Sequence, residues 1–245
     1  MNVKAMPRLK ALTFDLWDTL IQEVPRKNPK LGKVRVKEMR SKLHSFGFDY
    51  GLEPLERAYR QSGDYCDEVW ARKKDLPVDD HLLFMLNCID PKLRSELGKK
   101  RYETIRDIYV GTLLKHPPVL MEDVAPTLQS LRSKGYRIGL ISNTGRTPGD
   151  ILRIILNRLS IDQYFDHMTF SNEVLIRKPK KEIFQHTLKK MRAAPRHSMH
   201  IGDDLEADYE GAKAVGMKAV LLDRDNEQAP CEDRIQALSD LLEIL

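Results

Sequence analysis

Short apolar runs of strand length recur along this chain and are separated by stretches with helical periodicity. The candidate strands are residues 9–16, 136–142, 167–170, 197–202 and 218–222. The candidate helices, in which apolar residues recur at three- and four-residue spacing, are residues 124–133, 150–159, 181–191, 205–215 and 233–245. Buried strands that alternate with helices are typical of a parallel sheet covered by helices on both faces. The pattern therefore predicts an α/β fold with a sheet of about five strands.

One long segment breaks this alternation. Residues 21–118 show helical periodicity throughout and no convincing buried strand. The helices expected within it are residues 34–46, 53–74, 79–88 and 93–114. The sequence His116-Pro117-Pro118 closes the segment as a stiff connector. We therefore predict a core built from residues 1–20 and 119–245, with an inserted α-helical cap at residues 21–118.

The composition fits this organisation. The chain has 245 residues, of which 41% are hydrophobic and 31% charged, so it can bury a sizeable core. No apolar run approaches the roughly 20 residues that span a bilayer, and the start MNVKAMPRLK is polar, so we expect a cytoplasmic protein outside the membrane. Cys66, Cys88 and Cys231 stand far apart, without disulfide or zinc spacing, and are expected to be reduced. We expect a monomer or a homodimer.

Basic residues are concentrated near the start of the predicted cap. The formal net charge is +5, and the cluster consists of Arg26, Lys27, Lys30, Lys33, Arg35, Lys37, Arg40 and Lys42. Such a cluster can attract a phosphorylated substrate, but a solvated loop and helix face is favoured. A nucleic-acid partner is not favoured, because no zinc-finger spacing or aromatic-interleaved RNA-binding motif accompanies the basic residues.

Polar residues follow the predicted strands at their carboxyl ends, where an open parallel sheet binds its ligands. Asp15 ends the first strand, Ser142 and Asn143 end the second, and Asp203 and Asp204 end the fourth, with Asp208 one helical turn later. Carboxylates that converge on one point need a cation, and oxygen ligands without nearby Cys or His select Mg²⁺. Asp15 and Asp203 are the expected ligands. Magnesium in turn favours phosphoryl chemistry.

A lysine adds to this arrangement. Lys178 lies in the sequence RKPKKEIF, before Pro179 and at the start of a predicted helix. Proline biases the preceding residue out of helical geometry. Lys178 is therefore well placed to present a positive charge to a phosphate or a carboxylate.

Four short motifs in order resemble those of the haloacid dehalogenase superfamily, whose members are mostly Mg²⁺-dependent phosphohydrolases. The motifs are TFDLWDTL, LISNT, RKPKKEIF and MHIGDDLEADYEGAKAVGMKAV. Each motif alone is weakly specific, whereas four in order at successive strand ends are strongly so. The resemblance spans the chain and implies a Rossmann-like core. The helical insertion after the first motif is similar to the mobile cap of many members.

The resemblance also implies roles for individual residues. Asp15 corresponds to the nucleophile that forms an aspartyl-phosphate. Ser142 and Asn143 would bind the transferring phosphoryl group, and Lys178 would hold the nucleophile and the phosphoryl oxygens. Mg²⁺ would be held by Asp15, Asp203 and the backbone carbonyl of Trp17. Asp208, with Asp204, would order the metal's waters or orient Lys178.

Trp17 departs from the family pattern. Phosphatases of this family usually carry a second aspartate two positions after the nucleophile, as the general acid and base, and indole can do neither job. The next residue, Asp18, is a poor geometric substitute and is interpreted as occupying a left-handed backbone position that is often glycine.

Three functions therefore remain open. The first is a Mg²⁺-dependent phosphatase acting on a small phosphorylated metabolite. The second is a catalytically lapsed or regulatory member that binds a phosphorylated ligand. The third is a 2-haloacid dehalogenase, whose members carry an aromatic residue at the position of Trp17 but need no metal.

Three other side chains allow more than one interpretation. Trp70 lies at helical spacing from aromatic neighbours, and a place in the cap core is favoured over a ligand platform. Arg146 could meet an anionic leaving group, but a solvated surface position is favoured. His200 is expected to be a packed core residue.

Overall fold

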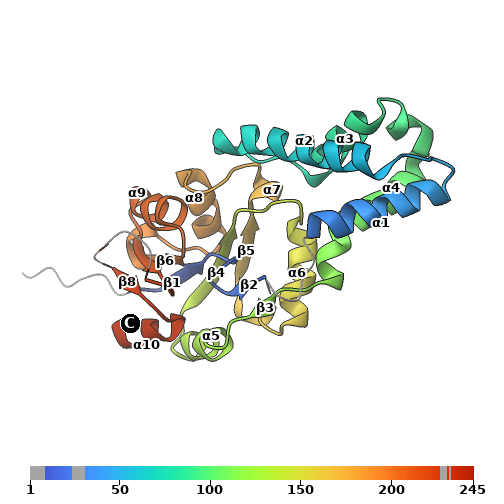
Figure 1. Ribbon diagram of the computed structural model, residues 1–245. Coiled ribbons are helices and arrows are strands. Elements are labelled where there is room, and N and C mark those ends of the chain that lie inside the picture. Colours follow the sequence, from blue (N-terminus) through green and yellow to red (C-terminus); the bar gives the residue numbers. More distant parts are fainter. Residues whose placement is uncertain (1–8, 24–30, 227–230, 232) are drawn as a thin grey trace, which may run out of the picture.

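The centre of the molecule is a parallel sheet (Figure 1). The computed structural model describes residues 9–23, 31–226, 231 and 233–245. Within them the sheet has six strands in the order β5-β4-β1-β6-β7-β8, and every neighbouring pair is parallel. Their bounds are β1 Ala11–Phe14, β4 Arg137–Ser142, β5 His167–Phe170, β6 Ser198–Gly202, β7 Lys218–Leu222 and β8 Arg234–Ile235. The predicted α/β fold is confirmed.

Strand β1 lies in the interior of the sheet, between β4 and β6. All four of its residues are buried, as expected for a strand covered on both faces. Phe14 is in register with Leu140 and Ile201, and the backbone N–H of Asp15 donates to the carbonyl of Ile201 at 2.9 Å. The carboxyl ends of the three strands therefore meet at one edge of the sheet.

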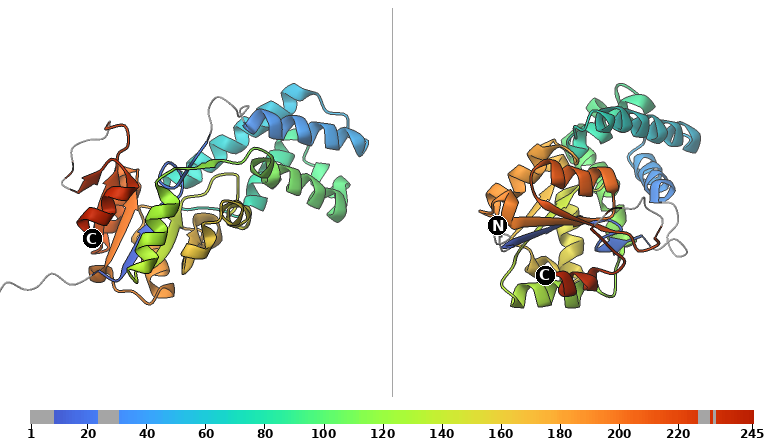
Figure 2. Two further views of the ribbon diagram at one scale, coloured as in Figure 1. Left: turned by 90° about the horizontal axis from the view of Figure 1, so that it is seen from below. Right: turned by 90° about the vertical axis from the view of Figure 1, so that its left-hand side faces the viewer.

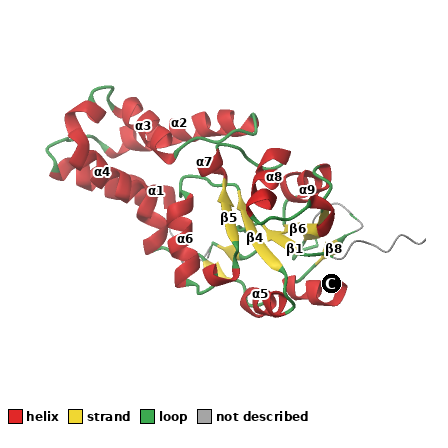
Figure 3. Ribbon diagram, turned by 180° about the vertical axis from the view of Figure 1, so that it is seen from behind, coloured by secondary structure: helices red, strands yellow, loops and turns green. Residues whose placement is uncertain are grey.

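Helices cover both faces of the sheet, as Figures 2 and 3 show. One face packs against α5 (Val124–Ser133), α6 (Gly149–Arg158) and α10 (Leu241–Ile244), and the other against α8 (Lys181–Lys190) and α9 (Gly211–Ala214). The apolar stripes predicted for α5 and α6 face this core, where Leu128, Leu131 and Ile155 are buried. Shorter helical turns complete the core at α7 Ser171–Val174, η1 Asp162–Tyr164, η2 Pro195–His197 and η4 Leu238–Asp240.

Four helices form a separate layer beside the carboxyl edge of the sheet (Figure 1). They are α1 Leu31–Ser45, α2 Leu52–Ala71, α3 Val78–Ile89 and α4 Leu93–Lys115. Each matches a helix predicted from the sequence to within a few residues at its ends. They share a hydrophobic core of their own, which includes Met39, Leu55 and Leu82. Helix α4 is broken at Gly98, whose φ of 64° only glycine adopts readily.

The junction between this helical layer and the core differs from the sequence prediction. Residues 21–118 were expected to contain no buried strand, yet Ile21 is fully buried in the core and lies in β2 (Ile21–Gln22). Strand β2 pairs antiparallel with β3 (Val119–Leu120), so the chain leaves and re-enters the core side by side. A two-residue strand is too short to show a periodicity of its own. The division into core and cap stays a prediction.

The C-terminal segment also differs. A single helix was predicted over residues 233–245, but the chain there forms β8, η4 and α10 in succession. The carbonyls of Asp233 and Ile235 accept backbone hydrogen bonds from the neighbouring strand β7 and its end, each at 2.9 Å. The Asp240 carboxylate accepts the N–H groups of Gln236 and Ala237, which ends the strand in a turn. A sheet edge and a side-chain cap thus override the helical periodicity.

In the part of the chain that the structure describes, no helix is both long and apolar enough to cross a lipid bilayer.

Candidate active site

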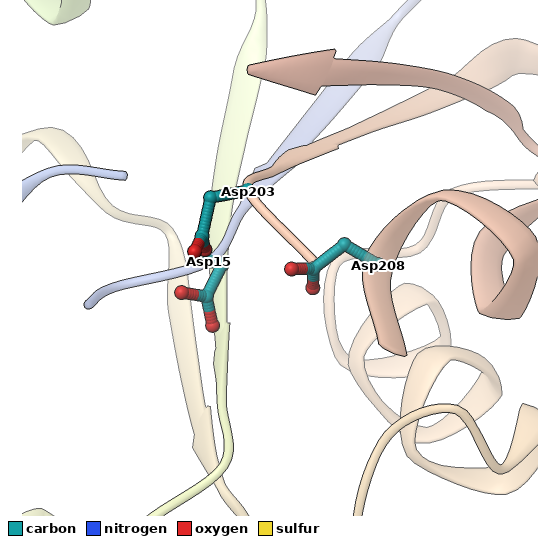
Figure 4. Close-up of side chains that lie close together, drawn as sticks. All are labelled: Asp15, Asp203 and Asp208. Carbon is teal, nitrogen blue, oxygen red and sulfur yellow. The ribbon is translucent and has the colours of Figure 1, made fainter. Parts of the chain in front are cut away.

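Three carboxylates from separate segments meet at the carboxyl edge of the sheet (Figure 4). Asp15 directly follows β1, Asp203 directly follows β6, and Asp208 lies in a wide helical turn, η3 (Leu205–Glu210). One oxygen from each lies within 4.8 Å of the others. Such wide turns are frequent at functional sites. The structure therefore brings together the aspartates that the sequence placed at strand ends.

Lys178 joins this group from the loop before α8. Its Nζ forms an ion pair with Asp15 and another with Asp208 at 2.5 Å, and the residue is 3% exposed. The peptide bond to Pro179 is cis. Asn143 fixes the lysine backbone, because its Oδ1 accepts the Lys178 N–H at 2.8 Å and its Nδ2 donates to the Lys178 carbonyl at 3.2 Å. One amide hydrogen of Asn143 is left for a ligand.

Asp208 is held by more partners than the sequence suggested. Besides Lys178, its carboxylate contacts His200 Nε2 at 2.9 Å and accepts the Asp204 N–H at 3.1 Å. The other ring nitrogen of His200 contacts the Thr13 hydroxyl at 2.8 Å. His200 was expected only to pack in the core, and it is fully buried, but it also orients Asp208.

The two-residue periodicity of a strand could have placed His200 on the face of β6 that Asp208 contacts. Residues two apart face the same side of a strand, so His200 and Gly202 share a face of β6. A Cβ atom at Gly202 would lie 2.2 Å from Asp208 Cγ. The glycine therefore provides the space in which Asp208 reaches the histidine and the lysine.

Burial and charge shape the titration of the site. Burial raises the pKa of Asp15 to about 8, opposed by Lys178 and reinforced by Asp208 and Asp203. Burial likewise raises the pKa of Asp203 to about 6. Burial alone would raise the pKa of Asp208 and lower that of Lys178, but their mutual attraction, with help from His200 and Asp15, reverses both shifts.

The donor set fits a divalent cation. One ammonium group faces three carboxylates, so the described site has an excess of negative charge. A cation beside Asp15 and Asp203 would favour the ionised forms of these two carboxylates. Oxygen donors without thiolate or imidazole ligands suit Mg²⁺.

The remaining predicted site residues take different positions. Ser142, the last residue of β4, is fully buried, and its Oγ has no hydrogen-bond partner among the described residues. A buried hydroxyl without a partner is costly and fits contact with a ligand oxygen. The Asp204 side chain instead accepts the Ala207 N–H at 2.7 Å and so caps the turn that carries Asp208.

Trp17 and Asp18 lie in the turn after Asp15. Asp18 has a φ of 54°, which confirms the left-handed backbone expected there. Trp17 is half-buried and packs against the core. It lines two cavities, together with Asn143: one of about 160 Å³ at the aspartates and Lys178, and one of about 350 Å³ toward the helical layer.

The fold and these residues define a hydrolase of a known family. The sequence model of the family of haloacid dehalogenase-like hydrolases matches residues 9–216, and the chain belongs to this family. The prediction of a hydrolase of this superfamily is confirmed.

Individual relatives agree with this assignment. The chain is 39% identical to a glyceraldehyde 3-phosphate phosphatase of Methanothermobacter thermautotrophicus over 90% of its own length and 88% of that protein. Two solved structures have the same fold. A phosphatase of the family from Thermococcus onnurineus has a TM-score of 0.62 at 24% identity, covering 96% of this chain and 97% of the other. A 2-haloacid dehalogenase from Pseudomonas syringae has a TM-score of 0.66 at 21% identity, with the same coverage.

Proposed function

We propose that this chain is a Mg²⁺-dependent phosphohydrolase that acts on a small phosphorylated metabolite through an aspartyl-phosphate on Asp15. The observation that carries the proposal is the double ion pair of Lys178 with Asp15 and Asp208, next to Asp203. The ammonium group offsets negative charge when one anion attacks another, and the carboxylates provide a nucleophile and oxygen ligands for a cation. The 39% identity to a named phosphatase over most of the chain supports the same activity.

The residues would act in two steps. The Asp15 carboxylate attacks phosphorus, and the bond to the leaving oxygen breaks with its electron pair on that oxygen. Water then attacks the phosphorus of the aspartyl-phosphate, which releases inorganic phosphate and restores the carboxylate. Lys178, oriented by Asp208, would neutralise charge on Asp15 and the phosphoryl oxygens, and the Ser142 hydroxyl and the free Asn143 N–H would bind those oxygens.

Magnesium would be held by Asp15, Asp203 and the backbone carbonyl of Trp17. When bound, it supplies positive charge that offsets the anionic phosphoryl group. The raised pKa values of Asp15 and Asp203 support such a site, because a cation would offset their causes, first burial and then the neighbouring carboxylates.

The proton that the leaving oxygen needs cannot come from Trp17. We expect this proton to come from solvent, with turnover reduced by roughly 10²- to 10⁴-fold relative to a site that has a general acid. The aromatic ring at this position also favours the dehalogenase alternative. Against that alternative stand Asp203 and Asp208, which a metal-free halide displacement does not require.

The test measures phosphate release from a broad panel of phosphate esters with Mg²⁺ and with chelator, and chloride release from 2-chloropropionate. The variants are Asp15→Asn and Trp17→Asp, with Asp107→Asn as the matched control, because Asp107 is an exposed carboxylate on α4. We expect Mg²⁺-dependent phosphate release that disappears in Asp15→Asn, persists in Asp107→Asn and increases in Trp17→Asp.

Two outcomes would replace the proposal. Chloride release that persists in chelator would identify a dehalogenase. Phosphate release that only Trp17→Asp shows would identify a lapsed member that binds its ligand without turnover.

A further inference from the structure

A second cavity lies between the helical layer and the sheet. Its volume is about 350 Å³, and its wall includes Arg35 of α1, Tyr59 and Trp70 of α2, and Arg146 from the loop after β4. Trp17 and Asn143 line both this cavity and the smaller one at Asp15. The two cavities therefore share part of their lining, and a ligand with its phosphoryl group at Asp15 would have to pass Trp17 to place its remaining atoms in this space.

Arg35 is buried in the cavity wall, and no described residue gives it a charged partner. It is 4% exposed, its Nε donates to the Tyr109 carbonyl at 2.6 Å, and its Nη1 donates to the Tyr59 hydroxyl at 2.8 Å. A guanidinium has five N–H donors, so three remain. No carboxylate among the described residues forms an ion pair with it. The solvated helix face expected for the basic cluster is therefore wrong for Arg35, although Lys33, Lys37 and Arg40 of the same helix are exposed. The other end of the cluster, with Arg26, Lys27 and Lys30, lies outside the described residues.

Arg146 also lacks a carboxylate partner among the described residues, although it is only half-buried. It was expected to be a solvated surface residue, but its guanidinium lies 4.0 Å from the centre of the Tyr59 ring and donates from Nη2 to the Tyr59 carbonyl at 3.1 Å. Its Nε is buried and has no hydrogen-bond partner in the described part of the chain. No described carboxylate pairs with this arginine either.

Arg177, which lines the same cavity, differs from these two arginines because its guanidinium has a carboxylate partner. Its Nη1 pairs with Asp75 at 2.9 Å and donates to the Thr144 carbonyl at 2.6 Å, and its guanidinium lies 4.5 Å from the Trp70 ring centre. Trp70 thus lines the cavity, whereas the sequence favoured a place in the cap core. Glu23 also lines the cavity but is exposed and forms no ion pair with Arg35 or Arg146.

Arg35 is buried and Arg146 is half-buried, and neither has an anionic partner among the described residues. Positive charge removed from water in this way costs free energy unless a ligand supplies the missing anion. We propose that the leaving portion of the substrate carries a second oxyanion, a carboxylate or a phosphate, which binds Arg35 and Arg146. The inference rests on the proposed function, because it places the transferred phosphoryl group at Asp15. Guanidinium groups bind both kinds of oxyanion through paired hydrogen bonds.

The experiment compares phosphate release from probes that differ in this second group. Glycerol 3-phosphate has a neutral leaving portion, 3-phosphoglycerate replaces its terminal hydroxymethyl with a carboxylate, and glycerol 1,3-bisphosphate provides a phosphate. The variants are Arg146→Gln and Arg146→Lys. Arg57→Gln is the control, since Arg57 is an exposed residue of α2 whose charge pairs with Glu53 at 2.7 Å.

We expect kcat/KM to be roughly 10- to 100-fold higher for at least one anionic probe than for glycerol 3-phosphate, mainly through a lower KM. Arg146→Gln should remove this preference, because kcat/KM should fall more for the anionic probes than for glycerol 3-phosphate. Arg146→Lys should retain part of it, and Arg57→Gln all of it. The more favoured anionic probe distinguishes a carboxylate from a phosphate as the second group.

Failure of this inference is separable from failure of the proposed function. Release from all three probes with equal kcat/KM, or a preference that survives in Arg146→Gln, would overturn the inference and leave the phosphatase in place. Absence of release from every probe would count against the phosphatase. Calorimetry would then test the inference without turnover. Tighter binding of 3-phosphonopropionate than of propylphosphonate, lost in Arg146→Gln, would support a second oxyanion site, and equal binding of the two would overturn the inference.

Discussion

Gly202 is the residue at which a single methyl group should disturb the whole site. A Cβ atom there would lie 2.2 Å from Asp208 Cγ and 2.4 Å from its Oδ2. Real atoms do not approach so closely, so Gly202→Ala must move the Asp208 carboxylate. That carboxylate is buried and is held by Lys178 at 2.5 Å, His200 at 2.9 Å and the Asp204 N–H at 3.1 Å.

Two costs contribute to the effect on stability. Overpacking a filled core costs about 1–3 kcal/mol. Moving Asp208 away from Lys178 breaks a buried ion pair, and complete loss of such a pair costs about 3–5 kcal/mol. Because Asp15 still pairs with Lys178, only part of the second cost applies. We expect the free energy of unfolding to fall by about 2–5 kcal/mol. Phosphate release should fall roughly 100-fold, since Lys178 loses the group that orients it.

Urea unfolding followed by circular dichroism measures the first effect. The matched control is Gly111→Ala in α4, where an added Cβ meets no atom within 4 Å. This control should stabilise the protein by about 0.5–1 kcal/mol, because alanine is a better helix former than glycine. A Gly202→Ala protein that is as stable and as active as the natural one would refute the argument that this close approach fixes Asp208.

Two further predictions concern the metal and a buried histidine. Mg²⁺ at about 100 times its Kd should raise the free energy of unfolding by about 2.7 kcal/mol, and Asp203→Asn should lose this shift in a thermal melt. Equal melting temperatures of the natural protein in Mg²⁺ and in chelator would contradict the metal site. His81 is buried, and neither ring nitrogen has a hydrogen-bond partner within the described residues. Burial lowers the pKa of His81 from 6.5 to about 4. Asp75 opposes this decrease, and Arg146, Arg177 and Arg35 add to it. Above pH 6.5 the ring is neutral in both states, so the stability should fall as the pH drops from 6.5 to 4, by at most about 3 kcal/mol. His81→Phe should reduce the dependence of stability on pH in this range. An unchanged slope would show that other groups cause the pH dependence.

Much of the fold and part of the site follow from sequence patterns with a direct physical cause. Strands covered on both faces are continuously apolar, which made residues 137–142 and 218–222 recognisable. Parallel strands end at one edge, so Asp15, Asp203 and Asp208 could be expected to converge. The roles assigned to these residues, the cytoplasmic location and the monomeric or homodimeric state stay predictions.

Other features depend on contacts that the local pattern of the sequence does not show. His200 has the pattern of a core residue, and its contact with Asp208 depends on the space that Gly202 leaves. Arg35 and Arg146 are separated by 111 positions in the sequence, and each resembles a surface residue there. They line one cavity because α1 and the loop after β4 face each other across the junction of the two layers.

The sequence by itself determined the alternation of strands and helices, the four motifs and the acidic edge of the sheet, because each rests on local periodicity or on the shared direction of parallel strands. The tertiary structure decided which polar side chains lack partners. Whether an arginine is solvated or buried without a carboxylate depends on what packs around it, and no local pattern records that. The same is true of Trp17, which the sequence marked as a missing proton donor and which lines both cavities in the structure.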